Sequence, residues 1–134
     1  MLPDDNLNHG YSQMASLEGF FRAAVKLTHI RNKRWWVNLS DGQPLERNVG
    51  EMLMLITSEL SEGMEGHRKN LMDDKLPTRS MLEVELADAV IRIFDMAGGL
   101  GLDLPGAWRA KMEYNAVRED HTDAARLAAN GKKY

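Results

Sequence analysis

The sequence predicts an all-α protein with a four-helix bundle-like fold, and three observations lead to this prediction. Apolar residues recur at helical spacing in four segments of the 134-residue chain. Turn-forming residues separate these segments, and strand signals are weak throughout. The length suits one domain with a genuine core, so a single domain is expected over residues 1–134.

The first third of the chain is expected to hold an arm, a helix and a long loop. Residues 1–11 carry Pro, Asn, Asp and Gly and are predicted to be a loose arm. A helix is predicted from Ser12 to about Arg34. Its apolar face consists of Phe20, Phe21, Ala24, Val25, Leu27 and Ile30. The turn formers between Trp35 and Asn48 then predict a loop of about a dozen residues, a length that is often functional.

Capping signals mark the next two helices. Asn48 is a suitable N-cap for a second helix that runs to about Lys69. The third helix is predicted to begin near Ser80, with Glu83 as its capping-box partner, and to end either at Gly98 and Gly99 or at Gly101.

A fourth helix and a tail complete the predicted chain. Leu104 and Pro105 begin a helix that is predicted to run to about Glu119. Residues 121–134 are Ala-rich and polar, and we expect a flexible tail that is only partly helical.

Composition excludes several classes of protein. The net charge of −3, from 20 acidic and 17 basic residues, argues against a protein that coats duplex nucleic acid. Because the chain has no cysteine, any metal ligands must be oxygen or imidazole groups, and a reducing cytoplasm is compatible. The sequence has neither an apolar run of about 20 residues nor the pattern of a signal peptide, so no membrane association is expected.

Two acidic pairs are the strongest functional signal. Glu59 and Glu62 lie one helical turn apart, and Glu85 and Asp88 repeat this spacing on the next predicted helix. On helical wheels both pairs occupy the same shoulder of the apolar stripe, so antiparallel packing would bring all four carboxylates face to face. A single pair is usually solvated surface charge. Two matched pairs favour a shared Mg²⁺ site, for which Mn²⁺ would be a substitute.

These motifs resemble those of the all-α nucleoside triphosphate pyrophosphohydrolases, especially the short MazG-like branch. The likeness covers residues 48–118 and includes the blocks ITSELSEGMEGHRKN, LEVELADAVIRIFDMAGGLGLDL and KMEYNAVR. It implies that the four carboxylates at 59, 62, 85 and 88 bind Mg²⁺ and carry catalysis. The implied reaction converts a nucleoside triphosphate to the monophosphate and pyrophosphate, in the cytoplasm of a bacterial or phage-infected cell. Glu62 is the candidate general base.

The resemblance also implies a set of substrate-binding residues. Lys111, Asn115 and Arg118 match a segment that contacts phosphates or nucleoside, and their spacing predicts one face of the fourth helix. Asp95 matches an assisting residue of the family. Trp36, beside several cations, is a candidate to stack on a nucleobase, although a tryptophan at such a place more often covers the core.

Three further residues bear on the site. The family pattern opens with two adjacent acids, but the first position here is Ser58, and Glu65 is poorly oriented to replace it. Arg92 can pair with an acid of its own helix, Asp88 or Asp95, or touch phosphate, and the ion pair is favoured. The histidines at 29 and 67 show no ligand-like partners and are expected to be structural or exposed.

The third predicted helix is apolar nearly all round, which is typical of a helix buried on every side. This pattern predicts a subunit interface, and the resemblance likewise implies a homodimer or homotetramer. Two other functions remain open: hydrolysis of a guanosine polyphosphate alarmone at the same site, or nucleotide or partner binding by a non-catalytic helical dimer. Base and sugar preference cannot be deduced from these motifs.

Overall fold

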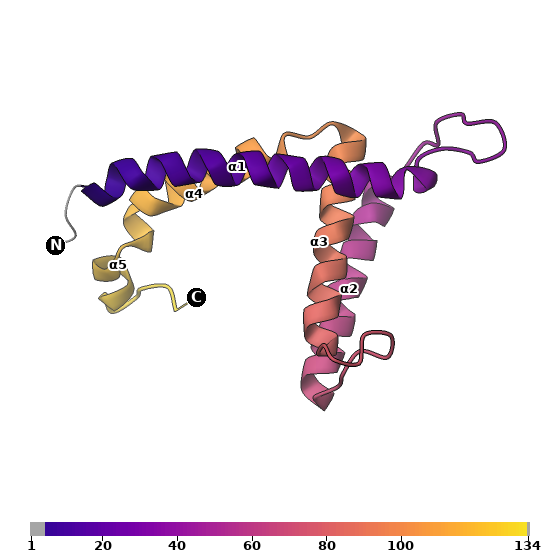
Figure 1. The fold of residues 1–134 in the computed structure, drawn as a ribbon. Helices are drawn as coiled ribbons and strands as arrows, with labels where there is room; N and C mark the ends of the chain where they lie inside the picture. Colours follow the sequence, from indigo (N-terminus) through magenta and orange to yellow (C-terminus); the bar gives the residue numbers. More distant parts are fainter. Residues whose placement is uncertain (1–4, 134) are drawn as a thin grey trace. The chain divides into compact units, whose positions relative to one another are not determined.

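The computed structural model describes the backbone of residues 5–133 and the side chains of residues 13–133. Within these residues the chain is all-α, as predicted, with five α-helices, two short 3₁₀ helices and two isolated β-bridges (Figure 1). The helices are α1 (Asp5–Asn32), η1 (Lys33–Trp35), α2 (Val49–Lys69), α3 (Met81–Leu100), α4 (Leu104–Val117), η2 (Glu119–His121) and α5 (Asp123–Leu127).

The predicted caps of α2 and α3 are present. The Asn48 side chain accepts a hydrogen bond from the backbone N–H of Glu51 at 3.0 Å, which begins α2. Ser80 and Glu83 form the predicted capping box at the start of α3. Gly101 ends α3 in the left-handed conformation, with φ of 68°, which glycine adopts without steric cost.

Helix α1 departs from the prediction at its start. It begins at Asp5, so the predicted loose arm is wrong for residues 5–11; residues 1–4 lie outside the described part of the chain. The Asn and Gly residues of this segment are weak helix formers. Extending an existing helix nevertheless adds a backbone hydrogen bond for each residue fixed, whereas nucleation is the costly step.

The other boundaries differ little from the prediction. Helix α4 ends at Val117, two residues early, because Arg118 adopts extended φ and ψ values of −66° and 129°. The tail is partly helical, as predicted, since α5 follows its N-cap Thr122.

The chain divides into two compact units. Residues 1–22 and 103–134 form one, and residues 23–102 form the other. Helix α1 contributes its first part to the 1–22/103–134 unit and its last part to the 23–102 unit. The predictions of one domain and of a four-helix bundle therefore stay predictions.

The 23–102 unit is built on a helical hairpin of α2 and α3, which lie side by side in Figure 1. Two buried glycines of α2 allow the close approach of α3. A Cβ at Gly63 would touch the Cβ of Glu85 at 3.4 Å, and one at Gly66 would meet Met81 at 2.7 Å. The hairpin is therefore closely packed both beside Glu85 and at the start of α3, where Met81 lies.

The predicted loop between α1 and α2 is confirmed and is held by backbone hydrogen bonds at its base. The N–H of Leu45 donates to the carbonyl of Trp36 at 2.9 Å, and the N–H of Asn38 donates to the carbonyl of Gln43 at 2.7 Å. A bridge between Val37 and Pro44 narrows the loop further. The loop thus has a defined shape although it contains no helix or strand.

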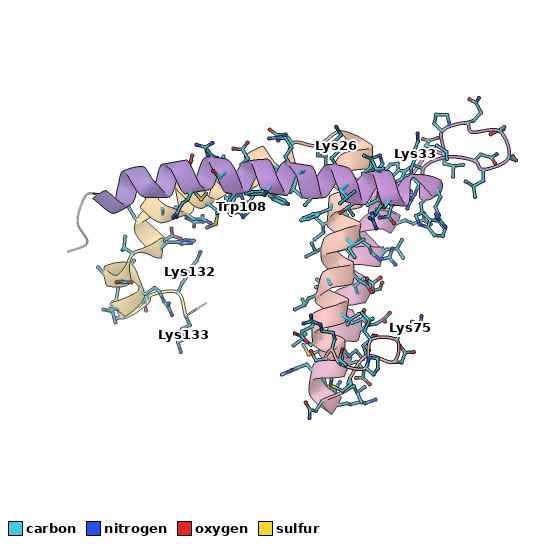
Figure 2. The ribbon with its side chains drawn as sticks, in the orientation of Figure 1. Lys26, Lys33, Lys75, Trp108, Lys132 and Lys133 are labelled. Carbon is cyan, nitrogen blue, oxygen red and sulfur yellow. The ribbon has the colours of Figure 1, made fainter. Side chains whose placement is uncertain are left out.

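The 1–22/103–134 unit packs α1 against α4 through aromatic and charged contacts. The rings of Phe21 and Trp108 meet edge-to-face with centroids 5.7 Å apart, and Figure 2 labels Trp108 on α4. Glu18 accepts hydrogen bonds from Arg22 and Arg109, each at 3.0 Å.

Many apolar side chains of α2 and α3 are exposed. Within one chain α3 is not covered on every side, because Leu86, Val90 and Ile91 are each more than 40% exposed, and the predicted subunit interface stays a prediction. Within the described residues α2 is the one extensive helix partner of α3, and a single helix cannot cover the whole circumference of another. Among the described residues, no helix is long and apolar enough to cross a membrane.

Candidate metal centre

Three of the four predicted carboxylates meet between α2 and α3. Glu59, Glu85 and Asp88 each offer an oxygen, and these oxygens all lie within 4.8 Å of one another. Glu59 and Glu85 are buried, with exposed fractions of 8% and 7%, and Asp88 is more open. Glu62 is exposed and is not part of this group, although its charge acts on Glu85. We call Glu59, Glu85 and Asp88 the acidic cluster.

The pKa of Glu85 is strongly raised, from 4.5 to about 7. Burial is the main cause, because it disfavours the charged form, and a hydrogen bond with Glu59 is the next. The negative charges of Glu62, Glu59 and Asp88 raise it further. Burial and the neighbouring acids thus disfavour the ionised form of Glu85, and a bound cation would favour it.

Arg92 supplies one compensating charge. Its Nε donates a hydrogen bond to Oε1 of Glu59, across from α3 to α2. The sequence correctly favoured an ion pair but named the wrong partners, Asp88 and Asp95. Acids three and four positions away on one helix are reachable, but Glu59 enters the same space from the facing helix.

A cavity of about 730 Å³ opens beside the cluster. Glu59 and Asp88 line it, while Glu85 does not. Its other lining residues come from α1, η1, the following loop, α2 and α3: Asn32, Trp35, Leu45, Glu46, Arg47, Leu55, Ile91, Arg92 and Asp95. This volume lies in the range of small-molecule sites, and an aromatic, apolar and charged lining suits a nucleotide.

Asp95 is held by two groups far away in the sequence. His29 Nδ1 lies 2.9 Å from Oδ1, and the indole N–H of Trp36 donates to both carboxylate oxygens at 3.0 Å. The His29 and Trp36 rings meet edge-to-face at 5.4 Å. Trp36 is thus engaged with Asp95, and its neighbour Trp35, 61% exposed, is the tryptophan that lines the cavity.

Two glycines of α3 make room for these rings. A Cβ at Gly98 would overlap His29, and a Cβ at Gly99 would overlap the indole of Trp36. The glycines that the sequence suggested as a helix end are therefore interior residues of α3, which continues to Leu100. Their role is close packing rather than termination.

The predicted phosphate-binding residues belong to the 1–22/103–134 unit. Lys111 and Arg118 both lie over the ring of Tyr114, at 5.0 and 5.6 Å from its centroid. Arg118 follows the end of α4, so it is not on that helix as predicted, because it turns to pair with Asp120. The side-chain oxygen of Asn115 is buried and has no hydrogen-bond partner among the described residues.

Asp120 also accepts a hydrogen bond from Lys132, which Figure 2 labels near the C-terminus. The two cations lower the pKa of Asp120 well below its usual value, with the hydrogen bond from Arg118 as the main cause. The guanidinium of Arg118 therefore already has a carboxylate partner.

Ser58 and Glu65 each have a partner on their own helix, outside the acidic cluster. The hydroxyl of Ser58 donates to the backbone carbonyl of Leu55 at 2.7 Å. Glu65 pairs with Lys69 and Arg68 on its own helix. His67 is exposed, as expected.

Sequence reasoning missed His29 and Arg47. His29 lies 66 positions from Asp95, and Arg47 stacks on Trp36 at 5.1 Å while donating to the backbone carbonyl of Trp35. Helical spacing cannot reveal contacts between elements so far apart. The adjacent glycines of α3 were the available signal, because they permit close approach of another element.

Comparison of the chain with protein-family models, with curated proteins and with solved structures gives no match.

Proposed function

We propose that the protein is a Mg²⁺-dependent nucleoside triphosphate pyrophosphohydrolase. The observation that carries the proposal is the acidic cluster, whose three carboxylate oxygens lie within 4.8 Å of one another beside a cavity of about 730 Å³. A surface array of acids would be solvated and separate, whereas Glu59 and Glu85 are buried together against their mutual repulsion.

The donor set fits Mg²⁺. The ion prefers carboxylate oxygens together with water and substrate phosphate, and the cluster offers three carboxylates next to open space. The pKa of Glu85 is raised mainly by burial and by its hydrogen bond with Glu59, and the negative charges of Glu62, Glu59 and Asp88 raise it further. A bound cation would offset that negative charge. Mn²⁺ takes similar oxygen ligands and is expected to substitute.

The carboxylates of the acidic cluster differ in their access to the cavity. Glu59 and Asp88 line the cavity, so they are placed to act next to the phosphates, and Glu85 supports them from behind. The bound cation would neutralise phosphate oxygens and lower the pKa of a water molecule. Glu62 is exposed one turn beyond Glu59 and remains the candidate base that accepts the proton of that water.

The cavity supplies space for the rest of a nucleotide. Trp35 and Leu45 provide an aromatic and an apolar wall for a base, and Asn32 provides hydrogen-bonding groups. Lys111, Asn115 and Arg118 stay candidates for phosphate or nucleoside contacts. We further propose that Trp36 and Asp95 bear on substrate binding through their bond to each other, which fixes the loop carrying Leu45.

We also propose that the active form is a homodimer or homotetramer that completes a four-helix bundle. The exposed apolar residues of the hairpin support this: Leu53, Met54, Leu55, Leu60, Met64, Leu86, Val90 and Ile91. A patch of this kind on a small protein usually marks an interface.

The test is pyrophosphate release from a panel of dNTPs, NTPs and guanosine polyphosphates, with Mg²⁺ and with EDTA. The proposal predicts Mg²⁺-dependent release from at least one nucleoside triphosphate, abolished by Glu59→Gln. Turnover confined to guanosine polyphosphates would instead establish an alarmone hydrolase. Folded protein that binds Mg²⁺ but turns over nothing would establish the binding module and contradict the proposal.

A further inference from the structure

The cavity beside the acidic cluster has more acids than bases. Its charged lining residues are Glu46, Glu59, Asp88, Asp95, Arg47 and Arg92. A phosphate chain that enters this space meets four carboxylates, and their repulsion opposes binding unless nearby cations offset it. The two arginines are the only side chains of the cavity lining that carry a fixed positive charge.

Arg47 already has two partners. It donates from Nη1 to the backbone carbonyl of Trp35 at 2.9 Å, and its guanidinium lies over the ring of Trp36 at 5.1 Å. These contacts fix the loop to η1. Arg47 therefore lines the cavity, and part of its hydrogen-bonding capacity is already used.

Arg92 is differently placed. Only its Nε is engaged, in the hydrogen bond to Glu59, and its two terminal nitrogens make no hydrogen bond among the described residues. Its side chain is 41% exposed, whereas that of Glu59 is 10% exposed. A guanidinium has five donors in a planar fork, so four N–H groups of Arg92 remain for a ligand on the cavity side.

The single hydrogen bond to Glu59 uses little of the hydrogen-bonding capacity of Arg92. An arginine that only neutralises a carboxylate commonly uses two parallel hydrogen bonds, as Arg118 does with Asp120. Arg92 instead holds Glu59 through the inner nitrogen, which orients the guanidinium without occupying its end.

Building on the proposed function, we propose that Arg92 binds a phosphate group of a Mg²⁺-complexed polyphosphate through its terminal nitrogens, while its Nε keeps Glu59 in place. Glu59 then has contacts on two sides, with the cation and with the arginine. Arg92 ties the position of the phosphate chain to that of the acidic cluster. Arg92 is a binding residue for the shared chemistry of nucleoside triphosphates, guanosine polyphosphates and inorganic polyphosphate.

The experiment is calorimetric titration of the full chain with inorganic tripolyphosphate in Mg²⁺, and separately with Mg²⁺ alone. The variants are Arg92→Gln, Arg92→Lys and the control Arg68→Gln. Arg68 is an exposed arginine of α2 that does not line the cavity. Its nearest nitrogen lies 3.8 Å from the carboxylate of Glu65, which is a long distance for an ion pair. Circular dichroism confirms that each variant is folded.

Tripolyphosphate affinity is expected to fall at least about tenfold in Arg92→Gln, because charge-assisted hydrogen bonds are lost. The tripolyphosphate affinity of Arg92→Lys should lie between those of the wild type and of Arg92→Gln, because lysine keeps the positive charge but lacks the planar fork of donors. Arg68→Gln should change less than about twofold, as exposed pairs contribute little. Affinity for Mg²⁺ alone should not fall in Arg92→Gln, because the arginine is no ligand and its charge opposes the cation.

Two results of the binding experiment would overturn the inference. One is tripolyphosphate binding by folded Arg92→Gln as tight as that of the wild type. The other is an equal loss of Mg²⁺ binding, which would make Arg92 a mere support of Glu59. Arg92-dependent binding without any pyrophosphate release would defeat the proposed function and leave this inference standing. Nucleoside triphosphate turnover that is insensitive to Arg92→Gln would defeat this inference and leave the proposed function standing.

Discussion

Replacing Glu85 with glutamine tests the electrostatics of the acidic cluster most closely. Glu85 is 7% exposed, and glutamine has nearly the same shape as the protonated acid. It keeps a donor for the hydrogen bond with Glu59 but cannot ionise. We expect Glu85→Gln to stabilise the metal-free protein at high pH and to abolish stabilisation by Mg²⁺.

The magnitude follows from the pKa of Glu85, which rises from 4.5 to about 7 on folding. Stability from this group is fully present below pH 4.5, where both states hold the proton, and is lost as the pH rises through 7. At about 1.4 kcal/mol per pH unit the loss is at most about 3.5 kcal/mol. Glu85→Gln should therefore match the wild type near pH 4.5 and exceed it by about 1–3 kcal/mol at pH 8.

The assay is urea unfolding in EDTA between pH 4.5 and 8, and the control is Glu83→Gln on the same helix. Glu83 is exposed, and hydrogen bonds from Ser80 lower its pKa. The stability that Glu83 contributes to the protein is therefore present above pH 4.5 and is lost as the pH falls below it. Glu83→Gln should therefore destabilise at pH 8, the opposite sign. A Glu85→Gln variant that is equally destabilised at both ends of the range would refute the reasoning.

Three further predictions concern packing. Gly99→Ala should destabilise by about 1–3 kcal/mol in urea unfolding because the new Cβ overlaps Trp36, while Gly19→Ala, with open space in α1, should stabilise by about 0.5–1 kcal/mol. A stability of Gly99→Ala equal to that of the wild type would contradict the close approach of Trp36 to α3. Trp36→Phe should cost about 1–3 kcal/mol by leaving Asp95 with one partner fewer, and a loss below about 0.5 kcal/mol would mean that the bond is unimportant. Met64→Glu, at a side chain that is 60% exposed, should convert the oligomer to monomer in sedimentation, and a monomeric wild type would contradict the interface.

Local signals predicted the helices well. Asn48, Ser80 with Glu83, and Gly101 form their caps because these interactions involve neighbours in sequence and need no tertiary partner. The start of α1 was missed because the extension of a helix through weak helix formers has no comparably sharp signal in the sequence.

The candidate site was predictable only in part. Equal spacing on two helices was enough to bring Glu59 to Glu85 and Asp88, because the hairpin repeats one geometry. The partners of Arg92 and Asp95 were not predictable in this way. Several acids compete for one arginine, and His29 reaches Asp95 only after α1 and α3 have packed.

The most direct test of the central claim is a Mn²⁺ titration of the metal-free protein, followed by electron paramagnetic resonance, with Mg²⁺ as competitor. The account predicts saturable binding that Mg²⁺ displaces and that Glu85→Gln and Asp88→Asn each weaken severely. Glu65→Gln, outside the acidic cluster on the same hairpin, should bind as the wild type does. Absence of binding, or binding that is indifferent to Glu85 and Asp88, would contradict a metal centre at these carboxylates.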